Sequence, residues 1–122
     1  MSFELTWQPK GVVKRFFGNV TSDELLGSVI QTEGDYRFDD LRYVINDFTE
    51  CTRYSISTEI VESISAIDSA AAASNPNIKI AVVATNAEMV ALAQQYADSP
   101  FNAYPTRIFA TIDEAKAWLG LP

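Results

Sequence analysis

The sequence predicts an α/β protein with a mixed, mostly parallel five-stranded sheet and helices on both faces. Segments with strand periodicity alternate with segments of helix periodicity in the order ββαβαβαβα. Residues 78–84 form a short apolar run typical of a strand that is covered on both faces. The 122 residues correspond to a single domain over residues 1–122.

The first two strands are predicted to form a β-hairpin. Phe3, Leu5 and Trp7 alternate with polar residues, which indicates a strand with one buried face. The sequence Pro9-Lys10-Gly11 interrupts this pattern before a second apolar run over residues 12–20. We therefore expect this part of the sheet to be antiparallel.

Three Thr-x-x-Glu sequences predict helix starts, at Thr21, Thr85 and Thr111. In each we expect a capping box, with the threonine hydroxyl accepting from the glutamate amide and the glutamate carboxylate accepting from the threonine amide. Isoleucines spaced three or four residues apart predict a further helix over residues 57–71, with its N-cap near Ser57.

Two more strands are predicted over residues 41–48 and 106–110. Residues 48–55 have no clear periodicity, so a loop is predicted between the strand and the next helix. Such a loop exceeds the usual connection of about 4 to 6 residues, and long loops often carry function.

The composition excludes several classes of function. Nine basic residues against sixteen acidic ones give a net charge of −7, which disfavours a nucleic-acid partner because phosphate binding needs clustered Lys and Arg. The absence of histidine removes imidazole-based catalytic triads and imidazole zinc sites. No apolar run reaches the roughly 18 residues of a membrane span, so no stable membrane insertion is expected. The sequence begins without a signal-peptide pattern, and we expect a cytoplasmic protein.

Isolated chemical motifs have structural interpretations. Asp47 and Thr85 end strands as in phospho-receiver domains, but the acidic pair and lysine of that site are missing, so capping roles are favoured. The lone Cys51 has no neighbouring histidine or second cysteine and is interpreted as unreactive. A cluster of carboxylates lacks calcium-loop spacing and is interpreted as a solvated turn; its members are Glu33, Asp35, Asp39 and Asp40. No cofactor is expected.

Three segments carry a resemblance to a known family. They are Tyr43-Val44-Ile45-Asn46-Asp47, the strand over residues 78–83, and the tail over residues 107–119 with its Asp-Glu-Ala-x-x-Trp-Leu helix. Together with the element order, they resemble the SpoIIAA-like group. That group is related to STAS domains, the anti-sigma factor antagonist and sulfate-transporter modules.

The resemblance implies a non-enzymatic interaction or regulatory module. In STAS antagonists, an Asp-Ser-Ser-Gly motif after the third strand holds a serine that a partner kinase phosphorylates, and this chain has Ser55-Ile56-Ser57-Thr58 there. The implied partner is another protein, a kinase or a regulator, and a homodimer is a further expectation. The candidate interaction or switch surface consists of Asp47, Thr49, Tyr54, Ser55, Ser57 and Thr58.

Two alternatives remain open at this point. Ser57 can serve only as a helix cap, without any switching role. The fold also resembles CRAL-TRIO lipid-binding domains, so the alternative function is a carrier of a small apolar or lipid-like ligand, held among the aromatic residues of the first half.

Overall fold

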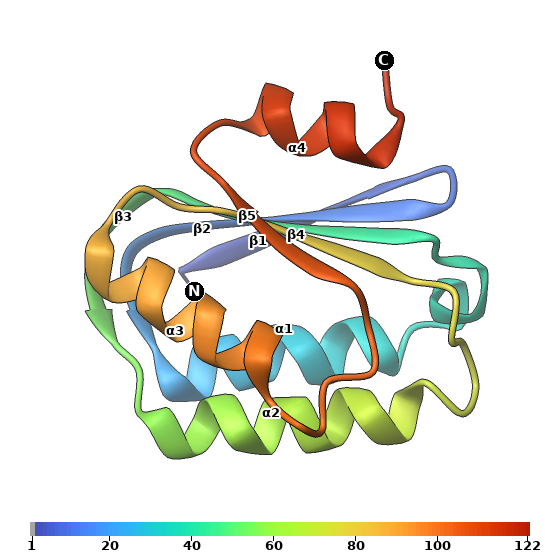
Figure 1. Cartoon of the computed structure of the whole chain (residues 1–122), viewed down its shortest axis with the longest axis horizontal. Helices are drawn as coiled ribbons and strands as arrows, with labels where there is room; N and C mark the ends of the chain where they lie inside the picture. Colours follow the sequence, from blue (N-terminus) through green and yellow to red (C-terminus); the bar gives the residue numbers. More distant parts are fainter. Residues whose placement is uncertain (1) are drawn as a thin grey trace.

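The computed structural model describes residues 2–122 and has three layers (Figure 1). A five-stranded sheet lies between one helix, α4 (Ile112–Leu119), and a layer of three helices on the opposite face. That layer consists of α1 (Ser22–Glu33), α2 (Thr58–Ala71) and α3 (Ala87–Asp98). A short 3-10 helix, η1 (Tyr36–Asp40), follows α1. Helices therefore cover both faces, as predicted.

The sheet is mixed and mostly parallel, which confirms the predicted fold class. Its strands lie in sequence order, with β1 antiparallel to β2 and every later pair parallel. The strands are β1 (Phe3–Gln8), β2 (Gly11–Thr21), β3 (Tyr43–Ser55), β4 (Lys79–Val83) and β5 (Thr106–Phe109). Each parallel connection moves one position in the same direction, so crossovers of one hand place α1, α2 and α3 on one face.

The helix starts at Thr21, Ser57 and Thr111 agree with the sequence. Thr111 forms the complete capping box with Glu114. Ser57 is the N-cap of α2, and its hydroxyl oxygen accepts from the amide of Ile60 at 3.2 Å. Each cap satisfies an amide that has no partner within the helix.

The other two predicted capping boxes need correction. Thr21 caps α1, but the Glu24 carboxylate accepts from the backbone amide of Ser2 at 2.7 Å instead of from the Thr21 amide. The box at Thr85 is wrong, because α3 begins one residue later with Asn86 as its N-cap. The Asn86 side-chain oxygen accepts from two successive helix amides, at 2.9 and 3.1 Å.

The sheet separates two hydrophobic cores. The larger core lies against α1, α2 and α3, where Phe16 is fully buried and stacks on Phe48 with ring centroids 4.6 Å apart. The smaller core lies under α4 and includes Tyr43, Ile45 and Ala115. Such apolar burial is the main favourable contribution to folding.

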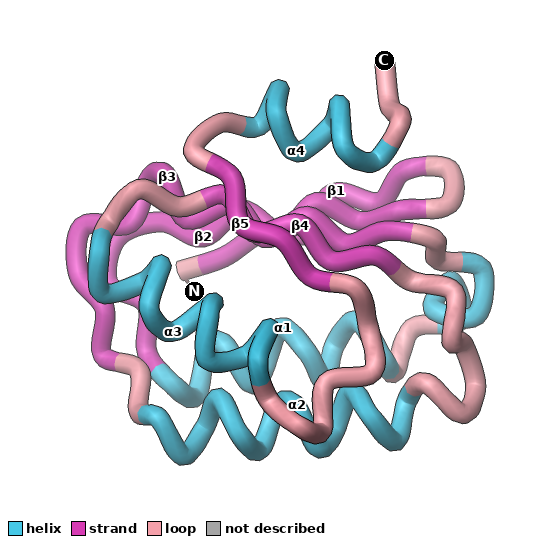
Figure 2. The backbone as a smooth tube through the Cα atoms, in the orientation of Figure 1, coloured by secondary structure: helices cyan, strands magenta, loops and turns pink. Residues whose placement is uncertain are grey.

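The predicted loop over residues 48–55 is wrong, because β3 continues to Ser55. This stretch pairs with β2 as far as Ser55, which lies opposite Thr21. In contrast, β4 pairs with β3 only as far as Asp47. The far ends of β2 and β3 thus extend beyond the rest of the sheet and lead into α1 and α2 (Figure 2). In the part of the chain that the structure describes, no helix is long and apolar enough to cross a membrane.

Candidate functional site

Ser57 lies exposed at the point where β3 leads into α2. Its backbone is extended, as expected of an N-cap, and its hydroxyl is held against the first turn of the helix. The unpaired amides and the dipole of a helix N-terminus favour negative charge at this position. An anion carried by the Ser57 oxygen would therefore meet a favourable local field.

A second helix begins beside the first. Because β2 and β3 are parallel and Thr21 pairs with Ser55, α1 and α2 start at the same edge of the sheet. The amide of Ser57 donates to the hydroxyl of Ser22 at 3.0 Å, and the hydroxyl of Ser55 donates to the Asn19 side-chain oxygen at 3.3 Å. Polar groups from both strand ends therefore surround Ser57.

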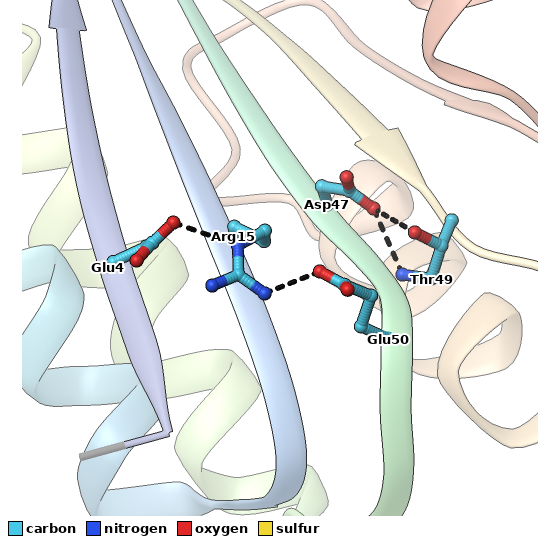
Figure 3. Close-up of polar contacts among 5 residues, drawn as sticks. All are labelled: Glu4, Arg15, Asp47, Thr49 and Glu50. Atoms are coloured by element: carbon cyan, nitrogen blue, oxygen red, sulfur yellow. Dashed lines mark hydrogen bonds and ion pairs between the residues drawn. The ribbon is translucent and has the colours of Figure 1, made fainter.

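Asp47 and Thr49 lie elsewhere on β3, where they stabilise an irregularity in the sheet. One Asp47 carboxylate oxygen accepts from the Thr49 amide at 3.0 Å and from the Thr49 hydroxyl at 2.7 Å (Figure 3). The pairing of β2 with β3 shifts register at this point, between Arg15 and Phe17. The carboxylate thus satisfies an amide beside the bulge.

A row of charged side chains crosses three strands beside this bulge. Arg15 of β2 donates to Glu4 of β1 at 2.8 Å and also to Glu50 of β3 (Figure 3). This cation lowers the pKa of Glu4 through a hydrogen bond and charge attraction. Since both carboxylates are well exposed and Arg15 is partly exposed, the row contributes little to stability.

Tyr54 and Cys51 face the larger core. The Tyr54 hydroxyl donates to the carbonyl of Phe48 at 3.2 Å, and both side chains pack against that core. Burial raises the pKa of the Cys51 thiol to about 11, with a smaller contribution from the carboxylates of Asp47 and Glu50. A thiol with so high a pKa is a weak nucleophile near neutral pH, in agreement with the interpretation of Cys51 as unreactive.

The candidate surface is therefore divided. Ser55, Ser57 and Thr58 lie together at the end of β3 and the start of α2. Asp47 lies eight residues before Ser55 on the strand, which corresponds to about 26 Å at the rise of an extended chain. The compact part is named the Ser57 surface below, and it consists of Asn19, Ser22, Ser55, Ser57 and Thr58.

Sequence reasoning missed the two residues that β2 and α1 contribute to the Ser57 surface. Part of the signal was present, because the sequence predicts that Thr21 caps a helix directly after the second strand of the hairpin, and that strand is also a parallel neighbour of β3. Parallel neighbours end at the same edge, so their following helices begin side by side.

The described residues, 2–122, hold no group of three or more His, Cys, Asp or Glu side chains that could bind a metal ion. One cavity of about 100 Å³ lies between the sheet and the layer of α1, α2 and α3. Sites for drug-sized ligands occupy about 300 to 1,000 Å³, so this cavity is too small for a lipid chain.

Comparison with solved structures identifies the fold. Over 97% of both chains, the structure matches the anti-sigma factor antagonist SpoIIAA in its unphosphorylated form, with a TM-score of 0.63 and 13% identity. The chain has a SpoIIAA-like fold. The Bacillus cell fate determinant SpoIIAA in the phosphorylated form matches with a TM-score of 0.62 and 15% identity, over 96% of this chain and 98% of that one.

A third structure has the same SpoIIAA-like fold. It is an uncharacterised protein of the DUF3478 family from Shewanella loihica, with a TM-score of 0.57 and 12% identity over 96% of this chain and 91% of that chain. No family model and no curated protein matches the sequence. These findings support a SpoIIAA-like fold.

Proposed function

We propose that this chain is a non-enzymatic, cytoplasmic regulatory module that exchanges protein partners according to the phosphorylation state of Ser57. The observation that supports the proposal is the exposed Ser57 hydroxyl at the start of α2, immediately after β3 in a SpoIIAA-like fold. Similar structures exist for SpoIIAA in both an unphosphorylated and a phosphorylated form.

The proposed switch acts through surface charge. A phosphate adds about 1.5 to 2 negative charges and three strong acceptor oxygens. Free amides of the first turn of α2 can donate to these oxygens, so the helix start tolerates the modification. The fold persists while the exposed surface becomes more acidic beside Glu59, which repels an acidic partner and attracts a basic one.

The proposed partners are proteins. A kinase would have to reach the Ser57 hydroxyl, and Ser57 and Thr58 are both exposed. A regulator would then read the altered charge of the Ser57 surface. A second copy of this chain is a further candidate partner, and the mass of the purified protein in solution would reveal it.

Affinity capture from the native host with three forms of the protein tests this proposal. Wild type, Ser57→Ala and Ser57→Asp should retain the same circular dichroism but recover different partners. Thr111→Ala is the matched control, because it removes an N-cap hydroxyl from α4 without touching the Ser57 surface. Identical partner sets for all forms, with no phosphate on Ser57 by mass spectrometry, would leave Ser57 with a capping role alone.

A further inference from the structure

A group of polar side chains converges inside the cavity between the sheet and the layer of α1, α2 and α3. Lys14 of β2 lines the cavity with only 5% of its surface exposed. Glu33 of α1, Asp68 of α2 and Tyr96 of α3 line it as well. A buried lysine in the middle of an otherwise apolar core requires a physical reason, because burial of charge is costly.

The ammonium group of Lys14 is incompletely bonded. Its one hydrogen-bond partner in the described chain is the Ser28 hydroxyl, at the long distance of 3.5 Å. Asp68 and Glu33 attract it electrostatically, and burial lowers the pKa of Lys14 to about 8. At neutral pH, Lys14 therefore still carries a positive charge in most protein molecules.

The cluster contains one more carboxyl group than it has ammonium groups. Asp68 accepts a hydrogen bond from the Tyr96 hydroxyl and lies close to Glu33. Burial, with a further contribution from the hydrogen bond with Asp68, raises the pKa of Glu33 to about 9. The raised pKa of Glu33 therefore favours its protonated form at neutral pH. The other ionisable side chain in the cavity is Tyr104, whose pKa burial also raises.

We propose that this cavity binds a small primary amine with a short apolar chain, whose ammonium group pairs with the side-chain carboxylate of Glu33. An incoming ammonium ion pairs with the Glu33 carboxylate, and the carboxyl proton leaves to solvent, so the buried charge stays balanced. An anion would leave one negative charge without a partner, because Lys14 is the only Lys or Arg among the described residues that line the cavity.

The size of the cavity sets the length of the amine. An engineered apolar cavity of 150 Å³ in another protein holds benzene, with six non-hydrogen atoms. A cavity of about 100 Å³ therefore suits about four or five non-hydrogen atoms. Apolar side chains around the polar cluster, such as Val44, Ile64 and Leu92, would contact the hydrocarbon part of the ligand.

This inference is independent of the proposed role of Ser57. The amine site lies between the sheet and the helices, whereas the proposed switch lies on the surface at the start of α2. Failure of either proposal therefore leaves the other standing.

Carbon-13 NMR of the Glu33 side-chain carboxyl at pH 7 tests the proposal with three probes of equal chain length: n-butylamine, 1-butanol and butyrate. The free protein should show Glu33 protonated, and saturation with n-butylamine should move its signal to that of an ionised carboxylate. Neither 1-butanol nor butyrate should do so, and butyrate should bind at least about tenfold more weakly than the amine. The exposed carboxyl of Glu88 serves as the control signal within the same spectrum.

Two variants separate the proposed pairing from simple filling of the cavity. Glu33→Gln keeps the shape of the side chain but cannot ionise, so the affinity for n-butylamine should fall about tenfold while that for 1-butanol is unchanged. Lys14→Met removes the competing cation, so n-butylamine should bind more tightly. The proposal is overturned if Glu33 is already ionised in the free protein, if n-butylamine leaves it protonated, or if butyrate is the preferred probe.

Discussion

Replacing Glu33 by glutamine should stabilise the protein, and the gain should increase with pH. The raised pKa of Glu33, about 9 against an ordinary value of 4.5, means that the folded chain keeps a proton that the unfolded chain has released. Between these two values, the contribution of Glu33 to the free energy of unfolding falls by at most about 1.36 kcal/mol for each pH unit. Glutamine has a similar shape and can donate to Asp68 without this proton uptake.

The structure sets an upper limit on this gain. The interval between the ordinary pKa of 4.5 and pH 7 is 2.5 pH units, which corresponds to a stability gain of about 3 kcal/mol at full effect. Glu33 is partly exposed, so solvent screening reduces the effect to about 1 to 3 kcal/mol at pH 7. At pH 5 the same substitution should be close to neutral.

Urea denaturation of wild type and Glu33→Gln at pH 5, 6, 7 and 8 measures the difference directly. Measurements stop at pH 8 because Lys14 has an effect of the opposite sign above that point. Its pKa is about 8 in the folded protein against an ordinary value of 10.5, so the contribution of Lys14 to the free energy of unfolding rises with pH between these values. Glu88→Gln, on the exposed face of α3, should show no comparable trend. A difference that is flat across this range, or a loss of stability at every pH, would refute the assignment of a protonated Glu33.

Three further experiments test the local structure. Asn86→Ala should lower the free energy of unfolding by about 0.5 to 2 kcal/mol, whereas Thr85→Ala should change it by less than about 0.5 kcal/mol; equal effects in urea denaturation would contradict the observed cap. Phe16→Ala should cost about 3 to 5 kcal/mol in the same assay, against little change for the exposed Phe101→Ala. Cys51 should react with a thiol reagent far more slowly at pH 7 in the folded than in the urea-unfolded protein, and equal rates would contradict its raised pKa.

Most of the fold could be predicted because periodicity and capping residues act locally. The alternation in β1 and the turn at Pro9-Lys10-Gly11 specify the hairpin without reference to any distant residue. The start of α3 was misplaced by one residue because Thr85 and Asn86 are both good capping residues. The choice between them depends on where β4 ends and which side chain then reaches the helix amides.

The second half of β3 could not be predicted from periodicity. Register shifts between Arg15 and Phe17, and between Gly18 and Asn19, place extra residues of β3 against β2 and break the two-residue alternation. A pattern that depends on strict alternation therefore interprets residues 48–55 as irregular. The partner strand that imposes this geometry is more than 30 residues away in sequence.

The polar cavity was missed for a different reason. Val12, Lys14 and Phe16 share one strand face by simple alternation, so the sequence did indicate that a lysine faces the core. Its partners Glu33 and Asp68 come from two different helices, and only the tertiary arrangement brings them together. The nearby acidic residues of the sequence favour a solvated turn, and this interpretation is wrong for Glu33, whose side chain lines the cavity.

The extension of β2 and β3 beyond the sheet also affects how the molecule opens. Residues 48–55 are hydrogen-bonded within the sheet to β2 alone, whereas residues 43–47 have strands on both sides. Separation of this outer stretch breaks one ladder and leaves the pairing of β3 with β4 and of β4 with β5 intact. Segments of this kind open at a lower free energy than the whole domain and exchange their amide hydrogens first. The Ser57 surface therefore sits on the part of the sheet that can deform without unfolding the protein.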